Sequence, residues 1–148
     1  MRTIKTVEEL IQFVDLKGIT PYQLVATRKD APSYEEVDES FDTKDAAGKL
    51  KMSVLAKPSP SQIELVFVTR IETDEAGCSL ELGRRDEHTE ELEVSELAIQ
   101  GLINRVAGMT VWPFIRQSAF SLATQIEVPV PLLGMIRQGD FDAMQDAE

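Results

Sequence analysis

Very few side chains in this sequence have the types and spacings that catalysis or metal binding requires. His88 is the only histidine and is expected on the solvated surface, because the charged segment around it offers no second histidine or cysteine pair as metal ligands. Cys78, the only cysteine, falls in an alternating strand pattern, so it is predicted to fill core space rather than act as a nucleophile. No glycine-rich phosphate loop and no Gly-x-Ser-x-Gly turn is present. The sequence therefore predicts no catalytic residue, metal site or cofactor, and an enzyme is not expected.

The composition is that of one acidic, soluble domain. A chain of 148 residues with 43% hydrophobic residues can bury a stable core without disulfides or bound metals, and its single cysteine allows no internal disulfide. The net charge of −11 argues against binding to nucleic acid or to an anionic membrane, since neither would release counterions to an acidic surface. The N-terminus has no apolar signal-peptide core, and no apolar run is long enough to span a bilayer. We therefore expect a cytoplasmic protein that does not insert into membranes.

The stretch 109–136 is poor in charge and contains only Arg116 and Glu127 as charged residues. At about 100° per residue, its apolar side chains form one stripe of an amphipathic helix. The stripe consists of Trp112, Ile115, Ala119, Leu122, Ala123 and Ile126. Phe114 and Phe120 fall outside it, so we expect them to be covered by another part of an assembly or to remain available to a partner.

Two helices are predicted in the C-terminal half of the chain. The first covers 94–107 and ends at Gly108, and its wide apolar face indicates burial against more than one surface. The second begins with Thr110 as its N-cap, tolerates Pro113 in its first turn and ends before Pro129.

The middle of the chain shows the period of two that is typical of strands. The predicted strands cover 22–27, 50–56, 63–71 and 78–82. The third has apolar residues on both faces, which predicts a central position, and the short polar turns favour antiparallel pairing. The acidic segment 33–49 is predicted to be a surface connection, and 84–93 is too charged to assign to a strand or a loop.

The N-terminus is predicted to form a short amphipathic helix. Thr6 and Glu9 make a capping box, the apolar residues Val7, Leu10, Ile11 and Val14 recur at helical spacing, and Gly18 is the expected stop. We expect this helix to dock on the core, with a regulatory or partner-binding role as the alternative. The sequence thus predicts an α+β fold, in which a four-stranded antiparallel sheet packs with two C-terminal helices, plus an additional N-terminal helix.

The order of motifs in the C-terminal half resembles that of the SecB family of protein-export chaperones. In that family, a helix is followed by a proline-rich apolar segment and a closing turn. The helix begins with an aliphatic or aromatic residue, proline, an aromatic residue and then arginine. The matching residues here are Trp112, Pro113, Phe114 and Arg116, then 128–133, then Asp140, Phe141, Asp142, Ala143 and Met144. The resemblance covers residues 19–148, which makes 1–18 an N-terminal addition to a SecB-like domain. It implies a homo-oligomer, either a dimer or a dimer of dimers (a homotetramer).

A chaperone that holds unfolded polypeptide needs exposed apolar grooves of low sequence specificity. The expected groove or cover residues are Val37, Phe41, Trp112, Phe114, Phe120, Leu132, Leu133 and Ile136. A position in the core or in a subunit interface is the alternative for each of them. In SecB chaperones an acidic patch on the sheet recruits the motor SecA, and the resemblance assigns this contact to Asp30 and Glu81.

Three functions stay open from the sequence. The first is an ATP-independent holdase that keeps unfolded preproteins ready for export through the Sec translocase. The second is a SecB-like chaperone dedicated to one client, such as an antitoxin, which the additional N-terminal helix and an imperfect match to the SecA patch keep open. The third belongs to another class, namely a small-ligand carrier or an enzyme with a pocket under segment 128–136.

Overall fold

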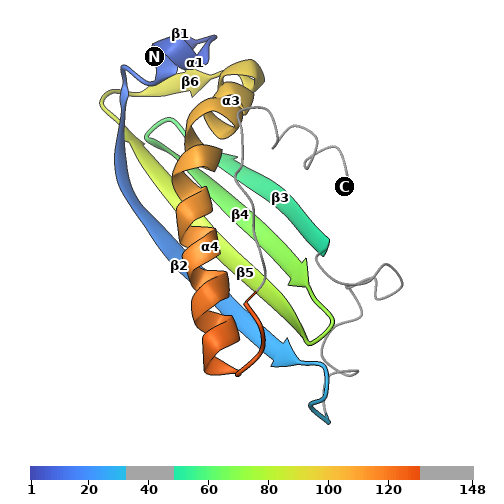
Figure 1. Cartoon of the computed structure of the whole chain (residues 1–148). Helices are drawn as coiled ribbons and strands as arrows, with labels where there is room; N and C mark the ends of the chain where they lie inside the picture. Colours follow the sequence, from blue (N-terminus) through green and yellow to red (C-terminus); the bar gives the residue numbers. More distant parts are fainter. Residues whose placement is uncertain (33–48, 131–148) are drawn as a thin grey trace.

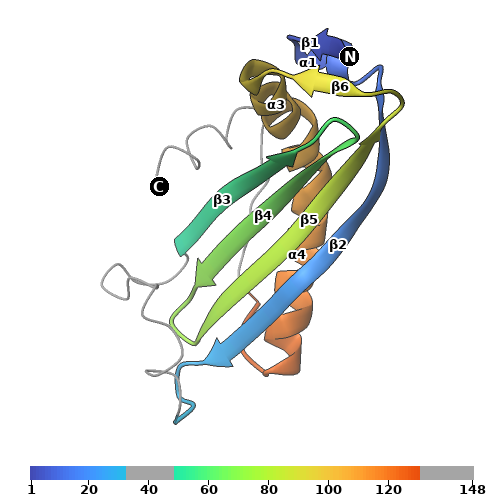
Figure 2. The same ribbon diagram turned by 180° about the vertical axis from the view of Figure 1, so that it is seen from behind.

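The computed structural model describes residues 1–32 and 49–130. Its main layer is a four-stranded antiparallel sheet with the strand order β2-β5-β4-β3. The strands are β2 (Val14–Arg28), β3 (Lys49–Pro58), β4 (Gln62–Glu72) and β5 (Ala76–His88). One face of the sheet is covered by a long helix, as Figures 1 and 2 show from opposite sides. The predicted α+β fold is therefore confirmed.

All four predicted strands are present, and each is longer than expected, β2 and β5 by the most. β2 begins at Val14 rather than at Tyr22, and β5 continues through the charged segment to His88. Within that segment, Arg84 and Asp86 are buried, whereas the residues that follow each of them are exposed. This alternation continues the period of two, so residues 84–88 are a strand extension.

β4 lies inside the sheet between β3 and β5, as its apolar residues on both faces predicted. Its cross-strand pairs identify which face meets the helix. Leu65 pairs with Arg84 of β5, and the Arg84 guanidinium bonds to Thr110 of the helix, so the odd-numbered residues of β4 face the helix. Phe67 is fully buried on this face, and Val66 is only 7% exposed on the other.

The helical layer is one unbroken run and not two separate helices. It consists of α3 (Glu96–Leu102), the π-helical turn η2 (Ile103–Ala107) and α4 (Gly108–Gln125). The predicted end at Gly108 is wrong, because Gly108 is buried and has helical dihedral angles (φ −59°, ψ −46°). Thr110 is not an N-cap, since its hydroxyl donates to the Val106 carbonyl one turn earlier at 2.6 Å.

Other helix boundaries also differ from the predicted ones. Val94 belongs to the short strand β6 (Leu92–Val94), and Ser95 is the N-cap of α3, where its hydroxyl accepts from the Ala98 amide at 3.2 Å. Pro113 lies in the second turn of α4 rather than the first and is exposed. The helix lacks one backbone hydrogen bond there, because proline has no N–H. Burial of the predicted apolar stripe outweighs this loss, with Ile115 fully buried and Ala119 1% exposed.

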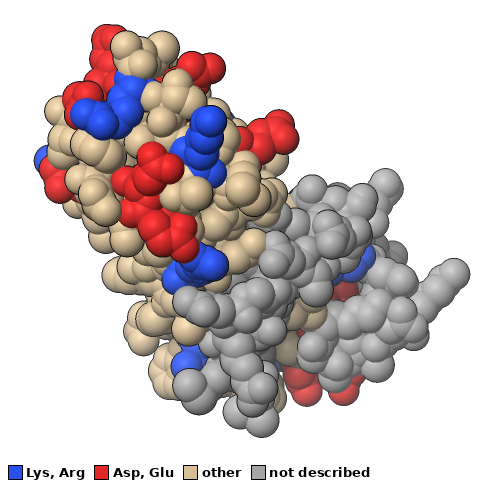
Figure 3. All heavy atoms as spheres, turned by 90° about the horizontal axis from the view of Figure 1, so that it is seen from above, with Lys and Arg blue, Asp and Glu red and all other residues tan. Residues whose placement is uncertain are grey.

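The N-terminal segment closes one end of the core. β1 (Arg2–Ile4) pairs in parallel with β6, and the helix α1 (Val7–Leu10) follows it. Ile4 and Leu10 are fully buried in the main hydrophobic cluster, which confirms that the N-terminal helix docks on the core of its own chain. Seen from this end of the molecule, the acidic and basic side chains of the described residues are interspersed with uncharged ones (Figure 3).

The capping box is present, but the helix that it starts is shorter than expected. The Thr6 hydroxyl accepts from the Glu9 amide at 3.2 Å. Val14, predicted on the helix, begins β2 opposite His88, and Gly18, predicted as the helix stop, lies within β2 beside a register shift. Pairing of this segment with β5 therefore replaces the last helical turns.

Candidate functional site

The side of α4 that faces away from the sheet carries large exposed apolar side chains. Met109, Phe114 and Phe120 are 41%, 49% and 53% exposed, and we call these three residues the outer helix surface. Met109 and Phe120 lie on one flank of the exposed face, and Phe114 lies about 120° around the helix from Phe120. The prediction that Phe114 and Phe120 fall outside the buried stripe is confirmed. The two flanks point in different directions, so the surface can meet two partners.

The other predicted groove residues have different positions. Trp112 is only 5% exposed and belongs to the core beneath the helix. The rest lie outside the described residues: Val37, Phe41, Leu132, Leu133 and Ile136. The closing turn 140–144 also lies outside them.

β2 forms one edge of the sheet and exposes further apolar side chains. Tyr22, Leu24 and Val25 are 54%, 39% and 38% exposed. Within residues 1–32 and 49–130, no strand pairs with the free side of β2, so the backbone N–H and C=O groups of that side are unpaired in the sheet. A free edge of this kind can accept a strand from another polypeptide.

Arg28 ties the end of β2 to the end of α4. Its guanidinium donates to both carboxylate oxygens of Asp30, at 2.8 and 2.7 Å, and to the Ile126 carbonyl at 3.2 Å. The hydrogen bonds from Arg28 favour the ionised carboxylate and lower the pKa of Asp30. The exposed Asp30 is therefore engaged within its own chain.

Glu81, the other acid predicted to contact SecA, is distant from Asp30. It lies on the sheet face opposite the helix, half-buried between Gln23 of β2 and Val68 of β4. At a strand rise of about 3.3 Å per residue, the five steps from Gln23 to Arg28 alone span roughly 17 Å. The structure thus does not bring the two acids together, and their contact with SecA stays a prediction.

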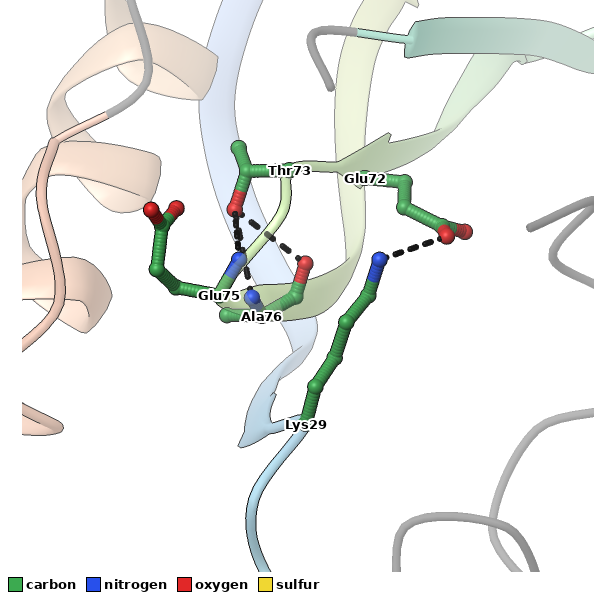
Figure 4. Close-up of polar contacts among 5 residues, drawn as sticks. All are labelled: Lys29, Glu72, Thr73, Glu75 and Ala76. Atoms are coloured by element: carbon green, nitrogen blue, oxygen red, sulfur yellow. Dashed lines mark hydrogen bonds and ion pairs between the residues drawn. The ribbon is translucent and has the colours of Figure 1, made fainter. Parts of the chain in front are cut away.

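A second ion pair stands beside the turn between β4 and β5 (Figure 4). Lys29 Nζ lies 2.8 Å from Glu72 Oε1, and the two side chains are 24% and 3% exposed. In the turn, the Thr73 hydroxyl oxygen accepts from the amides of Glu75 and Ala76 at 3.3 and 3.2 Å. These contacts fix the turn and anchor the end of β2 to it.

Cys78 and His88, the two residues considered for chemistry in the sequence, are both at least partly buried. Cys78 is 5% exposed, as predicted, and burial raises the pKa of its thiol. His88 is half-buried rather than fully solvated, and its Nδ1 lies 2.8 Å from the Pro60 carbonyl oxygen. In the part of the chain that the structure describes, no group of three or more His, Cys, Asp or Glu side chains is arranged to hold a metal ion. No helix in that part is both long and apolar enough to cross a membrane.

A buried ion pair beneath the helix was not predicted from the sequence. Arg84 and Asp86 lie on the helix side of β5 and are joined by two hydrogen bonds of 2.9 and 3.0 Å. The period-two pattern of the strand could have predicted it. Extending the alternation of Cys78, Leu80 and Leu82 by four residues puts the charged side chains of Arg84 and Asp86 on the face of the sheet that meets the helix.

Comparisons with known proteins give structural matches only. No protein-family model and no curated protein matches the sequence. The structure is similar to that of the Mycobacterium tuberculosis Rv1957 SecB-like chaperone in complex with a ChAD peptide from the Rv1956 HigA1 antitoxin, with a TM-score of 0.67 and 13% identity over 87% of this chain and 91% of that one. A protein of unknown function from Streptococcus agalactiae matches with a TM-score of 0.47 and 10% identity over 82% of this chain and 97% of that one. The chain therefore has a SecB-like fold, as its motifs predicted.

Proposed function

We propose that the protein is an ATP-independent chaperone that holds unfolded polypeptide on the outer helix surface. The observation that carries the proposal is the exposure of Phe114 and Phe120, each about half accessible, on the side of α4 that faces away from the sheet. Large apolar side chains that stay exposed on one helix mark surfaces that another polypeptide can cover. The similarity to a SecB-like chaperone that is in complex with a peptide supports this role.

The acidic composition is compatible with such a surface. A net charge of −11 makes copies of the protein repel one another, which opposes aggregation through the exposed aromatic side chains. The same charge does not repel an unfolded client that is neutral or basic. The protein can therefore present apolar groups without losing its own solubility.

We also propose that the protein works in the cytoplasm as a homo-oligomer, either a dimer or a dimer of dimers. The edge of β2, which no strand of residues 1–32 and 49–130 covers, and the two flanks of the outer helix surface offer separate contacts for a second subunit and for a client. One flank covered by a sister subunit would leave the other for unfolded polypeptide.

Unfolded preproteins destined for the Sec translocase are the proposed clients, and Asp30 and Glu81 are the proposed contacts of SecA. A dedicated client such as an antitoxin is the second candidate. Two observations favour the second candidate: the similar M. tuberculosis chaperone is in complex with an antitoxin peptide, and Asp30 is already bound by Arg28. Calorimetric titration of the wild-type protein and of the Asp30→Ala and Glu81→Ala variants with SecA distinguishes the two candidates. If the wild-type protein does not bind SecA, the export function is excluded and the dedicated client remains.

The chaperone proposal is tested by light scattering of a reduced, unfolded client in the absence of nucleotide. The wild-type protein is expected to suppress aggregation, and the variant Phe114→Ser/Phe120→Ser is expected to lose most of this effect. Leu55→Ser is the matched control, because Leu55 is also 53% exposed but lies on β3 of the sheet. A wild-type protein without any effect on aggregation, or equal losses in both variants, would refute the proposal.

A further inference from the structure

A buried ion pair links the sheet to the π-helical turn. The side chains of Arg84 and Asp86 are 6% and 1% exposed, which makes them the most deeply buried ion pair within residues 1–32 and 49–130. The remaining guanidinium nitrogen of Arg84, Nη1, donates to the Thr110 hydroxyl at 2.7 Å. That hydroxyl in turn donates to the Val106 carbonyl at 2.6 Å. A continuous chain of hydrogen bonds thus runs from β5 into η2.

The surroundings of the pair are apolar. Ile63 and Leu65 of β4, the cross-strand neighbours of Asp86 and Arg84, are fully buried. Charged pairs in such places are often no more stabilising than apolar side chains of the same size, so stability alone does not explain this one. The best attested role of buried polar groups is to select one arrangement of helices over others of similar energy.

The π-helical turn supplies such an alternative arrangement. In η2, the Gly108 amide donates to the Ile103 carbonyl five residues earlier instead of four. If the run became α-helical throughout while α3 stayed in place, α4 would turn forward by about 100°. Trp112 would then move from the core to the solvent side, and Phe114 would move from the solvent side toward the sheet.

We propose that Arg84 is a positioning residue that acts through Thr110 to hold the π-helical turn. Asp86 fixes the guanidinium, and the Arg84–Thr110 hydrogen bond stabilises the helix register in which Trp112 is buried and Phe114 is exposed. The consequence for client binding rests on the proposed function, whereas the helix register does not.

Trp112 is the only tryptophan and therefore reports the register directly. Thr110→Val keeps the shape of the side chain but removes its hydroxyl. We expect a red shift of the Trp112 emission and a rise of about twofold or more in its quenching constant by iodide, because a rotation of about 100° brings the indole to water. Thr110→Ser retains the hydroxyl and is expected to restore the wild-type emission and quenching.

Thr124→Val is the matched control. The Thr124 hydroxyl also donates to a carbonyl one turn earlier in α4, that of Phe120 at 2.9 Å, but Thr124 is exposed and not bonded to Arg84. Its substitution is expected to leave the Trp112 emission unchanged. A Thr110→Val protein that melts at a lower temperature with unchanged Trp112 emission and quenching would show that the bond only adds stability, and would overturn the proposal.

A second variant covers the case in which Thr110→Val does not fold. Arg84→Met/Asp86→Leu removes both charges and retains much of their volume, so folding is expected to survive. The proposal requires the same red shift and increased quenching here, and unchanged values would overturn it. Failure of the wild-type protein to suppress client aggregation would refute the proposed function alone, because the fluorescence readout needs no client.

Discussion

Val7 of α1 lies directly against Gly101 of α3, at the contact that docks the N-terminal segment. A Cβ atom on Gly101 would stand 2.7 Å from Val7 Cβ and 2.9 Å from Val7 Cγ1, closer than carbon atoms approach without displacement. Gly101→Ala is therefore expected to lower the free energy of unfolding by about 1–3 kcal/mol, because α1 and α3 would have to move apart to admit the added methyl group. Equilibrium unfolding in urea measures the change.

Gly18→Ala is the control for this substitution, since a Cβ atom at Gly18 would have no neighbour within 4 Å. Its expected effect is within about 0.5 kcal/mol. The double variant Val7→Ala/Gly101→Ala should be less destabilised than the sum of its single substitutions, because the smaller residue 7 makes room for the methyl group. Equal effects at Gly101 and Gly18 would contradict the close packing.

The hydroxyl of Tyr22 donates to Glu64 across Gly83 on the outer face of the sheet. This hydrogen bond raises the pKa of Tyr22 above its ordinary value of 10.0, since an ionised phenol cannot donate it. A raised pKa in the folded state means that the stabilisation is present below the ordinary pKa and is lost as the pH rises through the folded one. The difference in unfolding free energy between wild type and Tyr22→Phe should therefore shrink at alkaline pH.

The ionisation itself is measurable by ultraviolet titration of tyrosinate. The chain contains two tyrosines, so the Tyr34→Phe variant leaves Tyr22 as the only absorbing phenol that titrates. Its midpoint is expected above that of the urea-unfolded protein, and Glu64→Gln should bring the two midpoints closer together. Identical midpoints in folded and unfolded protein would exclude the hydrogen bond.

The strands of the four-stranded sheet were predictable from the sequence because alternation of apolar and polar residues is a local signal, whereas the three-residue strands β1 and β6 were not predicted. This signal identified all four strands of the sheet and the central position of β4. Where charged residues occupy inner positions, as Arg84 and Asp86 do, the signal is lost and the strand seems to end too early. Hydrogen bonds between the two side chains, and from Arg84 to the Thr110 hydroxyl, satisfy these buried charges, and neither contact is visible in the local pattern.

The helix boundaries were not predictable because their local signals are overruled by packing. Gly108 and Pro113 are typical of helix ends, yet the run continues through both, since it buries Trp112 and Ile115 against the sheet. The exposure of Phe114 and Phe120 was predictable because it follows directly from their place outside the apolar stripe. The burial of Trp112 also follows from the stripe, which makes it a core residue in this structure rather than part of the exposed surface.

Cys78 provides a probe of local opening. Burial raises the pKa of its thiol above the ordinary value of 9.0, so that little thiolate is present near neutral pH. We expect the folded protein to react with a thiol-specific disulfide reagent at least about 100-fold more slowly than the protein in denaturant, because the side chain must first be exposed. Comparable rates with and without denaturant would contradict the burial of Cys78.

The ion pair between Lys29 and Glu72 permits a test of how much charge pairing at this end of the sheet contributes to the free energy of unfolding. Lys29 is the carboxylate's ion-pair partner at 2.8 Å, and Glu72 Oε2 has no hydrogen-bond partner in the described part of the chain. Lys29→Met would leave the 97% buried carboxylate unpaired, because only 3% of the Glu72 side chain is exposed. We expect a loss of about 2–4 kcal/mol in unfolding free energy, somewhat less than for a fully buried pair because Lys29 itself is partly exposed.

The double variant Lys29→Met/Glu72→Met removes the unpaired charge and should recover most of this loss, since apolar side chains can replace a buried pair at little cost. Arg105→Met is the control, because it breaks the ion pair with Glu8 in which both side chains are more than half exposed. Its effect is expected to be much smaller, since water solvates the remaining carboxylate. If the double variant were as unstable as Lys29→Met alone, the loss would come from missing contacts of the lysine stem and not from an uncompensated charge.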